Sequence, residues 1–191
     1  MNLDNIFSSY VAYEKLNLNL EELTSYCYEK KKEDPVGIKV SNYGGWQSKS
    51  LNLNDEKIKH LFNSIVKVSI DVIDHYQLND TFAIEKLWIN INEKCDYNRV
   101  HIHPESVISG CFYVKVPKQS GNIVFQNPNS RIGFFEKYFK KHNYLTYSHY
   151  DYVPEENMIY MFPSWLEHYV EPNRSNEDRI SIAFNIGTQN D

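Results

Sequence analysis

Residues 82–92 decide the fold and read Phe-Ala-Ile-Glu-Lys-Leu-Trp-Ile-Asn-Ile-Asn. From Ala83 onward the residues alternate between two faces, which is the period of a strand that buries one side in a core. Similar alternation returns further along the chain, at residues 107–116, 122–126, 158–162, 167–171 and 179–186. Short strands that are separated by Pro, Gly and Asn favour two packed sheets. The pattern therefore predicts a mainly β fold with flanking helices, of the jelly-roll type.

Helices are expected upstream of these strands. The spacing of Asn19 and Glu22 matches a capping box for a helix that continues through Glu33. A longer helix should begin at Asn54 or Asp55 and end near residue 76, because apolar residues recur there every three or four positions. Such a helix packs its apolar stripe against a sheet. Between the two helices, residues 41–48 are predicted to form a loop that Trp46 anchors to the body.

One segment interrupts the strand pattern. Residues 127–154 are rich in Phe and Tyr and are too long for an ordinary hairpin loop. Long loops in compact domains tend to be lids or binding loops. We therefore expect a single domain over residues 1–191, with helical support in 1–80, a jelly-roll core in 81–191 and an aromatic insertion at 127–154 that is a lid or a binding loop.

Composition narrows the class of protein. The net charge is −5, so the sequence lacks the basic footprint of nucleic-acid binding. The three cysteines, Cys27, Cys95 and Cys111, are widely spaced and form no CxxC pair, which argues against a zinc knuckle and fits a reducing compartment. The first residues lack a signal-peptide pattern, and no apolar run approaches the roughly 18 residues of a membrane span. We expect a soluble, cytoplasmic protein that binds neither nucleic acid nor membrane.

Three histidines form a candidate metal site. His101 and His103 stand two residues apart before Pro104, at the expected mouth of a strand, so their side chains should leave the same face. His168 follows much later, from another expected strand. Imidazole ligates Fe, Zn, Ni and Cu alike. The other histidines are most easily interpreted as surface residues. Three imidazoles from these positions predict one mononuclear metal centre.

Arg179 and Ser181 form a candidate carboxylate site. Arg179 starts a strand with apolar alternate residues, and an unpaired buried charge is costly, so its guanidinium needs a partner. A guanidinium binds a carboxylate through two parallel hydrogen bonds, and Ser181 on the same face adds a hydroxyl donor. A salt bridge to Glu171, Glu177 or Asp178 is the alternative. The nearby His168 favours a dicarboxylic ligand beside the metal.

These residues resemble the Fe(II)/2-oxoglutarate-dependent oxygenases, and more narrowly a family of 2OG-Fe(II) oxygenases from bacteria and their viruses. The resemblance covers about residues 40–187. The matching blocks are Gly44–Ser48, His101–Ser106, Ser109–Pro117, Ser120–Phe125, Phe162–His168, Pro172–Asn173 and Arg179–Ser181. It implies a double-stranded β-helix, a jelly roll, and an oxidoreductase that uses Fe(II), 2-oxoglutarate and O2 to hydroxylate a substrate, with succinate and CO2 as products.

The resemblance also implies roles for single residues. Arg179 and Ser181 would hold the far carboxylate of 2-oxoglutarate, and Tyr113 matches a strand tyrosine that hydrogen-bonds the co-substrate in related prolyl hydroxylases, although a plain core tyrosine is the alternative. The superfamily pattern H-x-D/E is broken here, because the third position of the motif is His103. Two ligand sets remain: His101, His103 and His168, which we favour, or His103, Glu105 and His168.

Two other functions remain open at this point. A cupin-like metal enzyme without 2-oxoglutarate explains the histidines but gives Arg179 no role. A non-catalytic binding module explains the aromatic insertion but gives the histidines no role. If the chain is an oxygenase, its substrate is expected to be a small molecule or a peptide; a homodimer is compatible with the sequence, which does not fix the oligomeric state.

Overall fold

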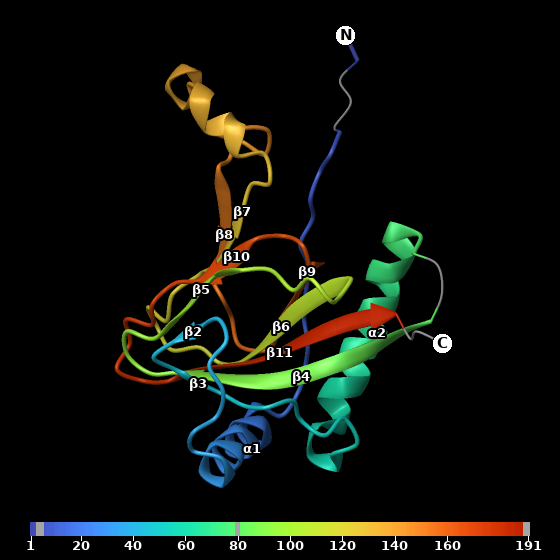
Figure 1. The fold of residues 1–191 in the computed structure, drawn as a ribbon, viewed down its shortest axis with the longest axis vertical. Coiled ribbons are helices and arrows are strands. Elements are labelled where there is room, and N and C mark those ends of the chain that lie inside the picture. The colour runs from blue at the N-terminus through green and yellow to red at the C-terminus, as the bar shows by residue number, and fades with distance from the viewer. Residues whose placement is uncertain (3–5, 79–80, 189–191) are drawn as a thin grey trace.

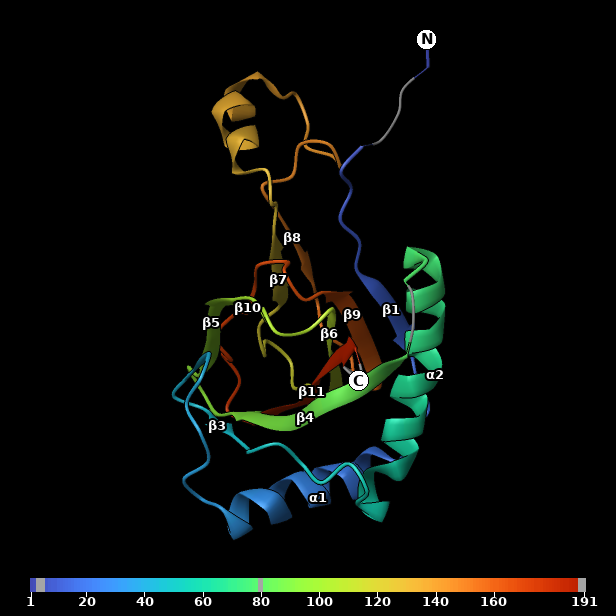
Figure 2. The ribbon, with the colours of Figure 1, turned by 45° about the vertical axis from the view of Figure 1, so that its right-hand side comes forward.

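Two antiparallel sheets face each other in the computed structural model, which describes residues 1–2, 6–78 and 81–188 (Figures 1 and 2). The larger sheet has the order β1 (Ala12–Lys15), β9 (Met158–Pro163), β6 (Ile108–Lys115), β11 (Arg179–Thr188), β4 (Phe82–Asn92) and β3 (Trp46–Gln47). The smaller sheet has the order β2 (Asn42–Tyr43), β5 (Tyr97–His101), β10 (His168–Val170), β7 (Ile123–Gln126) and β8 (His149–Tyr152). The predicted mainly β fold of two packed sheets is confirmed.

Two α-helices cover the outer face of the larger sheet (Figure 2). Helix α1 (Leu20–Glu33) begins after Asn19, whose Oδ1 accepts a hydrogen bond from the Glu22 N–H at 3.3 Å. Helix α2 (Lys59–Tyr76) follows a short 3₁₀ turn, η1 (Glu56–Ile58), that Asp55 caps. Both predicted helices are therefore confirmed, the second with a 3₁₀ first turn.

The alternation in β4 separates two environments. Leu87, Ile89 and Ile91 are fully buried against the helices. Trp88, Asn90 and Asn92 alternate with them and so point to the other side, between the two sheets. A second apolar cluster fills that interior, with Tyr113, Ile123, Phe125, Tyr160 and Phe162 among its members. The inner face thus combines an aromatic cluster with a row of polar side chains.

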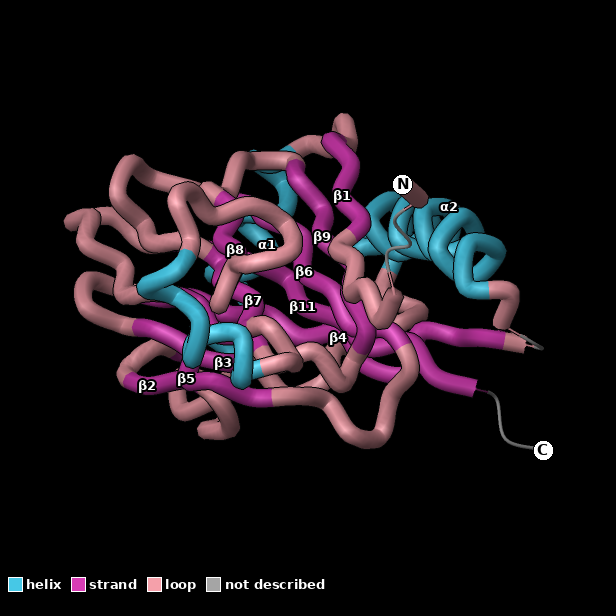
Figure 3. Tube along the Cα trace, turned by 90° about the horizontal axis from the view of Figure 1, so that it is seen from above, coloured by secondary structure: helices cyan, strands magenta, loops and turns pink. Residues whose placement is uncertain are grey.

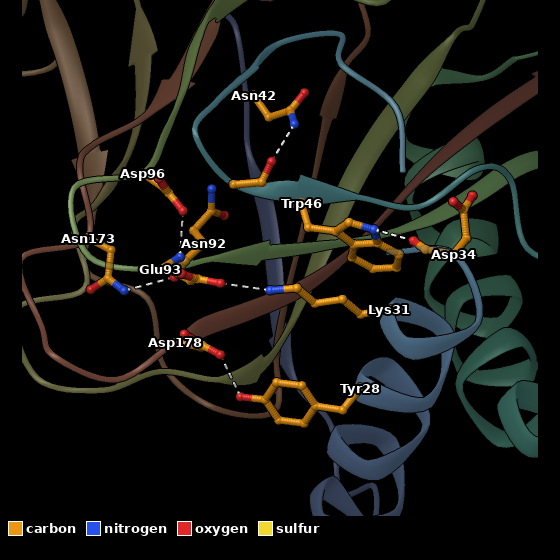
Figure 4. Close-up of polar contacts among 11 residues, drawn as sticks. Tyr28, Lys31, Asp34, Asn42, Trp46, Asn92, Glu93, Asp96, Asn173 and Asp178 are labelled. Carbon is orange, nitrogen blue, oxygen red and sulfur yellow. Dashed lines mark hydrogen bonds and ion pairs between the residues drawn. The ribbon is translucent and has the colours of Figure 1, made fainter. Parts of the chain in front are cut away.

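Several strands were not predicted from the sequence. Residues 41–48 were expected to form a loop, but they contain β2 and β3, which pair with β5 and β4. Trp46 is buried as predicted, and its indole N–H donates to the Asp34 carbonyl at 2.8 Å (Figure 4). β1 was also missed, whereas β5 was expected only as a strand that ends at the motif of His101 and His103. These strands are short, and main-chain pairing with longer strands defines them better than their own side-chain pattern does.

A polar network ties α1 to the start of β11 (Figure 4). Tyr28 donates to Asp178 at 2.8 Å, and Lys31 pairs with Glu93 at the same distance. Asn173 is fully buried and donates to the main-chain carbonyls of Asn92 and Glu177. These contacts fix the turn before β11 and so hold Arg179 at its position.

The aromatic insertion leaves the body as an arm, defined here as residues 127–148, which contains the 3₁₀ segment η2 (Ser130–Tyr138) (Figures 1 and 2). Figure 3 views the molecule from the side on which this arm and the N-terminus project. The prediction that 127–154 lies outside the strand pattern is wrong for residues 149–152, which form β8 and pair with β7. The arm is therefore the connection of a hairpin, contrary to expectation, because its two ends pair although the connection is long.

Across the described ranges, neither α1 nor α2 combines the length and the apolar character that a membrane span needs.

Candidate functional site

His101, His103 and His168 converge on one point. β10 pairs with β5 so that His168 lies directly opposite His101. His103 lies two residues beyond the end of β5, in a loop that a hydrogen bond from its N–H to the Ser164 carbonyl holds at 2.9 Å. One ligand atom from each ring lies within 4.8 Å of the other two, and the Nε2 atoms of His103 and His168 are 3.4 Å apart. Sheet pairing thus assembles the predicted set, although His103 does not belong to the strand itself.

Hydrogen bonds select the nitrogen that each ring presents. The Nδ1 atom of His101 lies 2.7 Å from the Arg99 carbonyl, and that of His168 lies 2.8 Å from the Leu166 carbonyl. A carbonyl only accepts, so both Nδ1 atoms carry the proton and both Nε2 lone pairs remain available to a metal.

Burial keeps these imidazoles neutral. Desolvation lowers the pKa of His103 to about 4 and that of His168 to about 3, and it lowers the pKa of His101 as well. All three rings are therefore unprotonated at neutral pH, which is the form that ligates a metal.

Glu105, the rival ligand, lies elsewhere. Its side chain is 84% exposed and its carboxylate lies 3.4 Å from the Lys86 ammonium group. The cluster of potential ligands contains the three histidines without it. The remaining histidines, His60, His75, His142 and His149, have exposed side chains. The structure brings together the first of the two predicted sets.

Arg179 is buried in the interior, with an exposed fraction of 1%. Its Nη1 donates to the main-chain carbonyls of Ser120 and Glu171. Its Nη2 is buried and has no partner among the described residues. The alternative of a salt bridge to a nearby carboxylate is not seen there: Glu177 pairs with Lys115, and Asp178 accepts from Tyr28. Burial lowers the pKa of this guanidinium, and a buried cation with an unused donor is suited to an anionic ligand.

Ser181 and Tyr113 lie next to this arginine on the same inner surface. Ser181 alternates with the buried Ile180 and Ile182, so it shares the face of Arg179. Ser181 is the cross-strand partner of both Tyr113 on β6 and Asn90 on β4. Tyr113 is 1% exposed, and burial raises the pKa of its phenol well above the ordinary value. All the residues predicted for the co-substrate therefore lie on one surface.

Comparison with known proteins identifies the family. The sequence model described as "Putative 2OG-Fe(II) oxygenase" matches residues 86–185, more than half of the chain. The chain belongs to this 2OG-Fe(II) oxygenase family. It is an oxidoreductase of the 2-oxoglutarate-dependent class, whose cofactors are Fe(II) and 2-oxoglutarate, with O2 as co-substrate. No curated protein sequence matches it.

Solved structures share the fold of the oxygenase. A prolyl-4-hydroxylase from Pseudomonas putida has a TM-score of 0.69 at 12% identity, with 94% of this chain and 93% of that one covered. A viral collagen prolyl hydroxylase from Paramecium Bursaria Chlorella virus-1, solved with 2-oxoglutarate, has a TM-score of 0.60 at 15% identity and coverages of 91% and 94%. HygX from Streptomyces hygroscopicus, with nickel and 2-oxoglutarate bound, has a TM-score of 0.66 at 10% identity and coverages of 95% and 84%. At sequence identities this low, the structural likeness establishes the double-stranded β-helix fold and no more.

The residues present fit the cofactors of the family. Three neutral imidazole nitrogens match the preference of a divalent first-row metal such as Fe(II). The unpartnered Nη2 of Arg179 matches a carboxylate of a dicarboxylic acid. Both features lie in the space between the two sheets, so metal and co-substrate would be neighbours.

Sequence reasoning missed other polar residues of this interior. Gln47 and Asn90 are 6% and 7% exposed and face each other across β3 and β4, and each has a buried side-chain oxygen without a partner in the described structure. Trp88 lies near the metal ligands, with its ring centroid 5.8 Å from that of His103. The alternation in residues 86–92 could have indicated Trp88 and Asn90, since the sequence puts Lys, Trp, Asn and Asn on one face. Nothing in the sequence pairs Gln47 with that face.

Proposed function

We propose that this oxygenase hydroxylates a C–H bond of its substrate, with one oxygen atom of O2 entering the substrate and the other entering succinate as 2-oxoglutarate loses CO2. His101, His103 and His168 would hold the iron in this reaction. The observation that carries the proposal is the convergence of one ring nitrogen from each of three histidines in the same interior as a buried arginine with an unused donor.

Arg179, Ser181 and Tyr113 would bind and orient the co-substrate. The guanidinium of Arg179 already has Nη1 occupied by two carbonyls, so Nη2 is the end that remains for the far carboxylate. The Ser181 hydroxyl and the Tyr113 phenol, whose raised pKa keeps it protonated, can donate to the same ligand. Because Arg179 and Tyr113 are almost fully buried, these charge-assisted hydrogen bonds are stronger than they would be in water.

The three-histidine set has an electrostatic consequence. Imidazoles are neutral, so an Fe(II) held by three of them keeps its full double charge, whereas a carboxylate ligand would neutralise part of it. Iron supplies the chemistry of O2 reduction when bound, and the side chains supply the position and the exclusion of water. A more positive centre favours the dianionic co-substrate.

The chain would work as one domain. We propose that residues 1–80 support the jelly-roll core of residues 81–191, to which they add the edge strands β1, β2 and β3, and that the insertion at 127–154 acts as a lid over the substrate. Large exposed aromatic side chains support the lid: Phe134, Phe135, Tyr138 and Tyr144 are between 55% and 78% exposed. Side chains of this kind usually meet a partner or ligand.

A single assay separates this function from its rivals. Purified protein is mixed with Fe(II), ascorbate and 2-oxoglutarate, and succinate is measured without any added substrate. The proposed function predicts slow succinate formation that requires both iron and O2. A cupin-like enzyme that does not use 2-oxoglutarate, or a non-catalytic binding module, would form none above the iron-only control.

A further inference from the structure

A cleft opens beside His101 and His103, and both side chains line it. The histidine cleft, as we call it, has a volume of about 610 Å³ and runs between the segments 38–50 and 99–105. Lys86, Trp88 and Asn185 complete its lining. Its size is typical of ligand sites, and two of the proposed metal ligands line it directly. A substrate in this cleft would therefore lie next to the metal.

The charge of the cleft is opposite to that of the whole chain. Lys49, Lys86 and Arg99 line it together with one carboxylate, that of Glu105, although the chain carries a net charge of −5. The Lys86–Glu105 pair is long, at 3.4 Å, and solvent-exposed, so little free energy is lost when it opens. Arg99 lies over the ring of Tyr43 at 5.4 Å and has no carboxylate partner in the described ranges. Lys49 pairs with Asp34 at 3.2 Å, so Lys86 and Arg99 are the cations of this lining that remain available to an anion.

Two buried carboxamides line the same cleft. The Oε1 atom of Gln47 is buried without a partner among the residues described, so the side chain lacks a donor. Asn185 is 7% exposed, and its Oδ1 accepts from the Ser109 hydroxyl at 2.9 Å, which leaves its Nδ2 as a donor. Buried carboxamides are rarely left unsatisfied, because each missing hydrogen bond costs free energy. The lining is thus suited to a ligand that both donates and accepts.

The spacing of these carboxamides points to an extended ligand. Gln47 lies opposite Asn90 on β4, whereas Asn185 lies opposite Lys86 on the same strand. Four residues of a strand span roughly 13 Å, and Trp88 lies midway along β4 between Lys86 and Asn90. An extended peptide covers that length with about four residues and offers an N–H and a carbonyl at each. A compact metabolite would reach only one of the two carboxamides, that of Gln47 or that of Asn185.

We propose that the histidine cleft binds an extended, acidic peptide segment as the substrate of this oxygenase, an inference that rests on the proposed function. Its main chain meets Gln47 and Asn185, its acidic side chains meet Arg99 and Lys86, and the residue to be hydroxylated lies against Trp88 beside the metal ligands. A small organic anion is the competing occupant.

The test is a selection from a random hexapeptide library with blocked termini on the full chain, loaded with redox-inert Zn(II) and 2-oxoglutarate. Selected sequences are expected to be enriched in Asp and Glu over Lys and Arg. The Lys86→Glu/Arg99→Glu variant should lose this enrichment and bind the best wild-type peptide at least about tenfold more weakly, because charge-assisted bonds are lost. The matched control, Lys32→Glu/Lys67→Glu, changes the net charge equally at exposed positions of α1 and α2 and should behave as wild type.

A companion variant tests the carboxamide. Gln47→Leu should weaken the selected peptide by about fivefold, the worth of one hydrogen bond, and leave the preference for acidic residues unchanged. The inference is overturned if the selection yields no acidic preference, if the cleft variant keeps it, or if only small carboxylates such as glutarate bind in the cleft. Binding of 2-oxoglutarate to the same variants, measured by calorimetry, stays unchanged in all these cases. If that binding is absent from wild type, the proposed function itself has failed.

Discussion

Arg179 is the residue whose replacement best separates ligand binding from folding. Lysine keeps the charge but loses the planar pair of N–H donors that a guanidinium offers to a carboxylate. Arg179→Lys should therefore raise the dissociation constant of 2-oxoglutarate at least about tenfold, while iron binding changes little. Ser181→Ala should raise it about fivefold, as expected for one hydrogen bond of about 1 kcal/mol. Calorimetry on the anaerobic metal-bound protein measures both. Arg174→Lys, at an exposed position, is the control, and equal constants for wild type and Arg179→Lys would make the arginine purely structural.

The ligand assignment gives a second prediction at single residues. His101→Ala should lower the affinity for Fe(II) by more than the roughly 10- to 100-fold that is lost when only a partner of a ligand is removed. Glu105→Ala should leave that affinity near wild type, because the carboxylate is exposed beside Lys86. Anaerobic metal titration compares the two variants. A severe effect of Glu105→Ala with a mild effect of His101→Ala would favour the shifted set.

Cysteine reactivity checks burial inside both cores. Burial raises the pKa of Cys27 and of Cys111 to about 12, so both remain thiols at pH 8, and a thiol is far less reactive than a thiolate. Cys95 is exposed. A disulfide reagent at pH 8 should therefore modify one thiol per native chain and three after denaturation. Rapid modification of two or three native thiols would contradict the packing around Cys27 or Cys111.

Residue-scale features differ in how far the sequence predicts them. The sequence indicated Arg179 and Ser181 because a buried guanidinium without a partner costs free energy. It indicated the three histidines because their spacing is suited to one metal ion. Gln47 was not found, because its importance comes from strand pairing, which places it opposite Asn90. Its amide looks like any polar side chain in a loop until that register is known.

At the scale of elements, the amphipathic pattern of the sequence predicted the helices and strands that bury a face in a core. β4, β6, β9 and β11 bury most of their residues on the larger sheet, and both helices have an apolar face, so each has a clear period. β8 is mostly exposed, and β5 buries only Asn98 of its five residues, so neither strand carries such a pattern. They exist because neighbouring strands supply their hydrogen bonds, a non-local effect that local pattern reading does not see.

The arm gives a prediction for an element. Arg131, Lys137, Lys140 and Lys141 are exposed in it, and the arm projects from the body, so trypsin should cut there first in the absence of substrate (Figure 2). The two fragments should stay together, since β7 and β8 remain paired. Mass spectrometry identifies the first cut. Initial cleavage in α1 or α2 with the arm intact would count against a lid.

At the scale of the whole molecule, the fold brings the site together from distant parts of the chain. β5 and β10 of the smaller sheet contribute His101 and His168, whereas β11 of the larger sheet contributes Arg179. The network around Asn173 and α1 fixes the turn that leads into β11 (Figure 4). The sequence could indicate which side chains belong to the site, but their meeting depends on the packing of two sheets.

The central claim is that iron and 2-oxoglutarate share one site at the three histidines. The most direct measurement is an anaerobic titration of the Fe(II)-loaded chain with 2-oxoglutarate, followed by the metal-to-ligand absorption band that appears only when the keto acid chelates the metal. We predict a band that saturates at one equivalent in wild type and is absent from His168→Ala. A wild-type chain that holds one iron and shows no band at saturating 2-oxoglutarate would contradict the account.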